Sequence, residues 1–131
     1  MNISDTIRSF NDVSGESFTL SCSIVDDRIC LKLAGKVDIQ NPDELLLPAL
    51  LKLDKDFIES KVHEIGFNIK ELEFINSSGI KVILQLVMGI LNRHGDQQYK
   101  IIFYHNPESK YQKKSFNAIS FLAPALISFV P

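Results

Sequence analysis

The sequence of 131 residues contains no tryptophan, only two cysteines and no long apolar run. Its 14 lysines and arginines nearly balance 16 aspartates and glutamates, for a formal net charge of −2. A weakly acidic chain without a long basic run is a poor candidate for binding nucleic acid or an anionic membrane surface. No stretch reaches the ~18 apolar residues of a membrane span, and the polar N-terminus lacks a signal-peptide core. We therefore expect a cytoplasmic protein with no nucleic-acid or membrane partner.

The remaining composition is that of an ordinary globular protein. Hydrophobic residues make up 45% of the chain and charged residues 23%, which argues against disorder. The length corresponds to one domain. We expect residues 1–16, which are polar, to form a loose N-terminal arm or short edge element, and residues 17–131 to form a single domain.

Two alternating segments predict a β-hairpin with one apolar face. Apolar and polar residues alternate over residues 18–24 and again over residues 29–33, as in half-buried strands. The two aspartates at 26–27 are expected to form the turn, and Gly35 to end the second strand.

The same register predicts where the two cysteines point. Cys22 lies on the apolar face of the hairpin, whereas Cys30 points to the opposite face. Side chains on opposite faces cannot easily form a disulfide. Two free thiols agree with a reducing compartment.

Helices and strands alternate along the rest of the chain. The order predicts an α/β fold, ββαβαβαβ, with a mixed β-sheet and helices packed mainly on one face. The first helix is expected to have an irregular first turn capped by Asn41, because Pro48 removes a backbone hydrogen bond. The elements expected after the hairpin are a main helix over 48–60, a strand over 62–69, an apolar connection over 72–75, a helix over 80–92, a strand over 99–104, a helix over 110–122 and a strand over 126–130.

The helix over residues 80–92 is apolar on one broad face when it is projected at 100° per residue. Val82 is the one apolar residue on the polar side of this projection. Together with the leucine-rich first helix, Val82 allows two interpretations, a homodimer contact or a completion of the core.

Three segments carry a further pattern, residues 35–38, residues 66–69 and residues 72–80, the last of which reads LEFINSSGI. These segments resemble the STAS domain family of bacterial anti-sigma factor antagonists and sulfate-transporter tails. The family signature is a strand, a connector, an aspartate, two small residues and a glycine that opens a helix. The resemblance covers about residues 18–130 and implies a STAS-like domain that regulates by binding proteins.

The resemblance also implies a switch at the helix start. The first serine of the turn is Ser77, which in the family is phosphorylated by a partner serine kinase that is also the anti-sigma factor, and a phosphatase resets it. Ser78 is the runner-up phosphoacceptor. The residues that the resemblance assigns to partner binding are Gly35, Asp38, Asn76, Ser77, Ser78, Gly79 and Lys81.

The residues themselves support two interpretations of this turn. A serine at a helix start is most often a cap, which is worth about 1 kcal/mol. A phosphate on Ser77 would be tolerated at the helix N-terminus, yet it would put charge into a docking surface. The chain has Asn76 and Asn68 where the family usually has aspartates, so a constitutive adaptor that has lost the switch is the alternative.

Sequence motifs of catalysis are absent, and we expect a non-enzymatic protein without cofactor or metal. There is no Gly-rich phosphate loop, C-x-x-C or H-E-x-x-H. A small serine hydrolase using Ser77 is a further alternative, although the turn lacks the first glycine of a nucleophile elbow. Near the C-terminus, Lys110, Lys113 and Lys114 surround Tyr111, and they predict a solvated helix face or a patch for an acidic partner.

Overall fold

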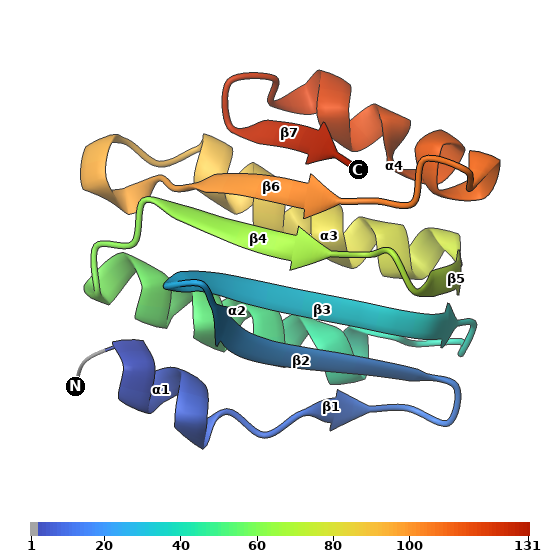
Figure 1. Ribbon diagram of the computed structural model, residues 1–131, viewed down its shortest axis with the longest axis horizontal. Coiled ribbons are helices and arrows are strands. Elements are labelled where there is room, and N and C mark those ends of the chain that lie inside the picture. Colours follow the sequence, from blue (N-terminus) through green and yellow to red (C-terminus); the bar gives the residue numbers. More distant parts are fainter. Residues whose placement is uncertain (1–2) are drawn as a thin grey trace.

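The computed structural model describes residues 3–131, which form a seven-stranded mixed sheet with helices packed against it (Figure 1). The strand order is β1-β2-β3-β4-β6-β7, and β5 pairs with the end of β3. The α/β fold with a mixed sheet is therefore confirmed. The elements are α1 (Ile3–Ser9), β1 (Val13–Ser14), β2 (Phe18–Val25), β3 (Arg28–Val37), α2 (Asp43–Glu59), β4 (Glu64–Asn68), β5 (Leu72–Ile75), α3 (Ser77–Leu91), a 3-10 turn (Gly95–Gln97), β6 (Lys100–Tyr104), α4 (Lys110–Leu122) and β7 (Ile127–Val130).

The hairpin has the predicted register. Asp26 and Asp27 both have positive φ, as the central residues of a tight two-residue hairpin turn require. Ser23 pairs with Cys30, and Cys22 with Leu31, so the two cysteines point to opposite faces. Both thiols are free, as predicted.

Strands β3, β4, β6 and β7 run parallel, so their carboxyl ends meet at one edge of the sheet. Alternate residues of β3 are buried, Leu31 and Leu33 among them, while Cys30 and Lys32 on the other face are half-exposed. Helices α2 and α3 contact each other and lie behind the sheet in Figure 1, and α4 packs beside α3. The buried residues of the sheet and helices form one hydrophobic cluster.

Two strand predictions were wrong at the end of β3. Gly35 does not end the strand, because β3 continues to Val37 through a register shift between Gly35 and Lys36. Residues 72–75 are not a plain connection, because they form β5 beside this extension of β3. Gly35 has a φ of +92°, and a Cβ there would lie 2.2 Å from the carbonyl oxygen of Ser17, so only glycine is accommodated.

Helix α2 tolerates Pro48 without the predicted irregular first turn. It runs unbroken from Asp43, and its N-cap is Pro42 rather than Asn41. The missing amide of Pro48 leaves the carbonyl of Glu44 without its helical donor, but Glu44 is exposed at the first turn, where water can supply one. Burial of Leu46, Leu50, Leu53 and Phe57 then stabilises the whole helix.

Helix α3 is apolar on more than one face. Val82 is 1% exposed and belongs to the core, so the prediction that it lies on a polar side was wrong, and it cannot contribute to a dimer contact. The buried face also includes Leu86 and Ile90, whereas Leu91 is 37% exposed. The buried residues lie on a single face, so the apolar band of α3 is wider than the face it buries, and the projection was centred on the wrong part of that band.

The segment before residue 17 contains a helix that the sequence analysis did not expect. Helix α1 buries Ile7 against the core, and β1 pairs with β2 at the sheet edge. Only Ile3 and Ile7, one turn apart, mark this helix in the sequence. The first two residues of the expected arm lie outside the described residues.

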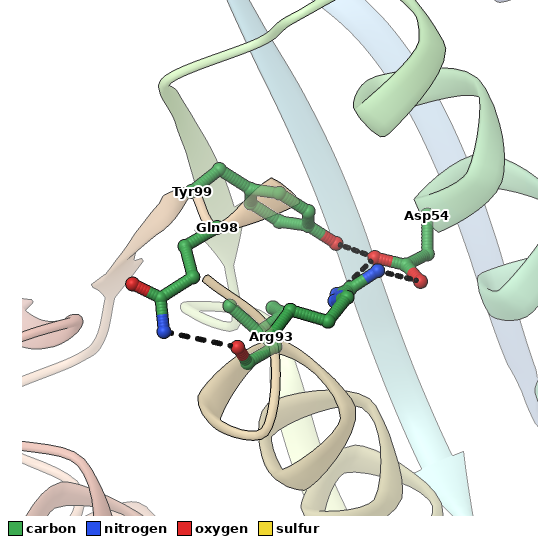
Figure 2. Close-up of polar contacts among 5 residues, drawn as sticks. Asp54, Arg93, Gln98 and Tyr99 are labelled. Atoms are coloured by element: carbon green, nitrogen blue, oxygen red, sulfur yellow. Dashed lines mark hydrogen bonds and ion pairs between the residues drawn. The ribbon is translucent and has the colours of Figure 1, made fainter. Parts of the chain in front are cut away.

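An ion pair and a tyrosine join α2 to the segment between α3 and β6 (Figure 2). The Arg93 guanidinium donates to both carboxylate oxygens of Asp54 at 2.9 Å, and the Tyr99 hydroxyl donates to Oδ1 at 2.6 Å. Burial and this hydrogen bond raise the pKa of Tyr99 well above its usual range. The contact lies at the amino end of β6, opposite the edge where the parallel strands end.

Among the described residues, no helix is long and apolar enough to cross a membrane.

Candidate functional site

Asn76 caps helix α3 and ties it to a segment far away in the sequence. Its side-chain oxygen accepts a hydrogen bond from the amide of Gly79 at 2.8 Å, in the geometry of an N-cap. Its side-chain nitrogen donates to the carbonyl oxygen of Ile39, also at 2.8 Å. Its backbone amide donates to the carbonyl oxygen of Val37 at 2.9 Å. One residue therefore holds the end of β3 against the start of α3.

This arrangement brings together the two segments that the resemblance assigns to partner binding. Asp38 follows β3 directly and is exposed, next to the carbonyl that Asn76 binds. Gly35 lies earlier on β3, where its amide donates to the carbonyl oxygen of Glu71. Asp38 thus lies near the helix start, whereas Gly35 supports the strand that leads there.

The two serines occupy the first turn of α3 and are not its cap. Ser77 is exposed and Ser78 is half-buried. Because Asn76 already caps the helix, neither hydroxyl is needed for that purpose, and within residues 3–131 neither makes a hydrogen bond. Lys81 is exposed one turn after Ser77, at the spacing where side chains on a helix meet.

Gly79 contributes by close packing and not by exposure. A Cβ at this position would lie 2.7 Å from a side-chain carbon of Ile75 and 3.0 Å from one of Val37. The first turn of α3 can therefore approach the ends of β3 and β5 only because residue 79 has no side chain.

Two residues of α4 that the sequence did not single out hold β5 in place. The Tyr111 hydroxyl donates to the carbonyl oxygen of Ile75 and accepts from the Ile75 amide, directly before the cap. The Tyr111 ring also stacks on Phe74, at 5.5 Å between ring centroids and 17° between planes. Phe74 is 39% exposed and adds an apolar contact point beside the site.

The second missed residue is Gln112, which is 2% exposed. Its side-chain nitrogen donates to the carbonyl oxygens of Ile69 at 2.7 Å and Leu72 at 2.9 Å, and its side-chain oxygen accepts from the amide of Asn106 at 2.8 Å. It fixes the connection between β4 and β5. The lysines around Tyr111 suggested a solvated face, although Gln112 lies one turn before Phe116, at the spacing of the buried residues of α4.

Neither cysteine belongs to this site. Burial raises the pKa of the Cys22 thiol to about 12, and burial also raises the pKa of Cys30. A thiol in this state is a poor nucleophile at neutral pH. Within residues 3–131, no three His, Cys, Asp or Glu side chains cluster as metal ligands.

Replacing Asn76 by aspartate separates its two roles. Asn76→Asp keeps the acceptor for Gly79, but it removes the donor to Ile39 and places a carboxylate against that carbonyl. We expect a free energy of unfolding within about 1 kcal/mol of wild type, because Asp and Asn cap equally well and one hydrogen bond is lost. Amide hydrogen exchange of residues 38–41 should nevertheless become faster.

Asn76→Ala is the matched variant, because it removes both side-chain hydrogen bonds. It should lower the free energy of unfolding by about 2 kcal/mol in urea titrations. Unchanged amide exchange of residues 38–41 in the aspartate variant would show that the bond to Ile39 does not order this segment.

No protein-family model matches the chain, and no curated protein matches it in sequence. Solved structures match it in fold. An anti-sigma factor antagonist from Mycobacterium paratuberculosis has a TM-score of 0.54 and 11% identity, covering 88% of this chain and 89% of that chain. The anti-sigma factor antagonist SpoIIAA in its unphosphorylated form has a TM-score of 0.50 and 19% identity, covering 86% and 88%. An uncharacterized DUF3478 protein from Shewanella loihica with a SpoIIAA-like fold has a TM-score of 0.52 and 16% identity, covering 93% and 89%.

These likenesses cover most of each chain at low sequence identity, so they concern the fold. They agree with the resemblance that residues 35–38 and 66–80 indicated from sequence. The chain has the SpoIIAA-like fold found in anti-sigma factor antagonists.

Proposed function

We propose that this protein is a non-enzymatic regulatory module that binds a protein partner where β3 ends and α3 begins. We call Asp38, Phe74, Ser77 and Lys81 the docking surface. The observation that carries the proposal is the double hydrogen bond of Asn76, which fixes the two halves of this surface relative to each other. A surface held in place before binding loses less entropy when the partner docks.

Ser77 is the proposed phosphoacceptor, with Ser78 as the runner-up. Its exposure at the first turn of α3 supports this role, because a kinase must reach the hydroxyl and the helix N-terminus accommodates the phosphate. The proposed partner is a serine kinase that is also an anti-sigma factor, and a phosphatase reverses the modification. Because Asn76 is neutral, the kinase itself must supply the carboxylates that hold the metal for phosphoryl transfer.

The second candidate function is a constitutive adaptor, in which the same surface binds a partner without a switch. The bond from the Asn76 side-chain nitrogen to Ile39 favours it, because an aspartate cannot make this bond. A small serine hydrolase has less support. Within residues 3–131 no hydrogen bond joins Ser77 to a histidine.

A photo-crosslinking amino acid at position 81 tests the docking surface in native cells. Position 100 is the matched control. Lys100 is exposed at the amino end of β6, away from the carboxyl ends of the parallel strands. We expect one protein to be captured from position 81 and not from position 100. Equal capture from both positions would contradict a defined docking surface.

Ser77→Ala then separates the candidate functions. A phosphoswitch becomes permanently docked, and its crosslink persists under every growth condition. An adaptor behaves as wild type, and a hydrolase loses turnover.

A further inference from the structure

A cavity of about 440 Å³ opens between α4 and the carboxyl ends of β6 and β7. Its apolar wall is formed by the rings of Phe116 and Phe129, which pack edge to face with centroids 6.3 Å apart and planes inclined by 64°. His105 directly follows β6 and lies edge-on to Phe129, at 6.1 Å between ring centroids. The cavity therefore has the shape and lining of a site for the apolar part of a small molecule.

The polar lining of the cavity includes a cation and no anion. Lys113 supplies an ammonium and His105 an imidazole, the neutral polar side chains are those of Gln112, Asn117 and Ser120, and no carboxylate is among the lining residues. Lys113 is exposed, and within residues 3–131 it forms no ion pair. An unpaired cation beside an aromatic wall complements an anion that carries an apolar group.

The position of the cavity separates it from the docking surface. It lies at the carboxyl ends of the parallel strands β6 and β7. The cavity is built on the last two strands of the sheet and on α4, whereas Asn76 and Ser77 lie beside β3 and β5. It is therefore a site separate from the docking surface.

We infer that this cavity binds a small amphipathic carboxylate, with its apolar body against Phe116 and Phe129 and its carboxylate at Lys113. The inference does not depend on the proposed docking function. Phenylbutyrate is a suitable probe, and phenylbutyramide is the neutral control of the same size. In a two-dimensional amide NMR titration, phenylbutyrate should shift the signals of residues lining the cavity and saturate, and the amide should bind more weakly.

Two variants and one control locate the binding. Lys113→Gln should weaken the binding of phenylbutyrate by about fivefold, which is the effect of one partly exposed charge pair. It should leave the affinity for phenylbutyramide unchanged. Ser120→Phe should weaken the binding of both probes, because the larger side chain fills the cavity. Lys114→Gln, an exposed neighbour outside the lining, should change neither. Equal affinity for acid and amide, shifts away from α4 and β7, or no saturation at the solubility limit would overturn the inference.

Discussion

Phosphate on Ser77 is expected to weaken binding of the docking partner by about a hundredfold or more, because an unpaired charge buried in an interface costs several kcal/mol. The phosphate adds roughly −1.5 to −2 charges at the centre of the docking surface. The domain itself should stay folded, because the first turn of α3 accepts anions and Lys81 lies one turn away. The effect is measured by calorimetric titration. The partner identified by crosslinking from position 81 is purified and titrated with protein that carries genetically encoded phosphoserine at position 77.

Phosphoserine at Ser23 is the matched control. Ser23 is exposed on β2 near the hairpin turn, at the end of β2 and β3 away from Val37. It adds the same charge, but it should leave the affinity unchanged. Equal weakening by both modifications would mean that net charge and not the docking surface controls binding, and full affinity with phosphate on Ser77 would exclude a switch there.

Gln112→Leu is expected to lower the free energy of unfolding by about 3 kcal/mol, at about 1 kcal/mol for each of three lost hydrogen bonds. Leucine has a similar size but leaves the carbonyl oxygens of Ile69 and Leu72 and the amide of Asn106 without this partner. Gln112 is 2% exposed, so water cannot readily replace it. Urea denaturation of the two proteins gives the difference.

Lys114→Leu provides the control for this prediction, because Lys114 is exposed two residues further along α4. It should change the free energy of unfolding by about 0.5 kcal/mol or less. If Gln112→Leu were equally mild, the connection between β4 and β5 would be held by something other than this side chain.

The elements that the sequence predicted well are those with a strong local pattern. Alternation on both sides of a two-residue turn fixes the register of the hairpin, because a slip of one residue would expose the whole apolar face. The third predicted helix has the predicted bounds, since Ser109 caps it and Pro107 precedes it. In both cases the residues that determine the element lie within it or a few residues before it.

The elements that the sequence missed depend on partners far along the chain. Residues 72–75 bury their first and last side chains and do not alternate, so only pairing with residues 35–37 of β3 makes them a strand. Val82 was misplaced because the apolar residues of α3 form a band wider than the face it buries, and a helical projection does not show which part of that band is buried. Helix α1 is short and polar, and packing against the core stabilises it.

The candidate site was predictable in part. The turn at residues 76–79 identifies a helix start, and the family resemblance pairs it with residues 35–38. The bond from Asn76 to Ile39 was not predictable, because its acceptor is a backbone carbonyl 37 residues away. Nor could the sequence show that the Tyr111 hydroxyl forms hydrogen bonds with the backbone of Ile75, since the three lysines around Tyr111 indicated an exposed face.

Phosphosite mapping by mass spectrometry, on the protein isolated from its native cells with phosphatases inhibited, tests the switch at Ser77. We expect phosphate on Ser77 in a fraction of molecules that changes with growth phase or stress. A Ser77 that stays unmodified under all of these conditions would contradict the switch and leave the constitutive adaptor, with Asn76 in place of the acid.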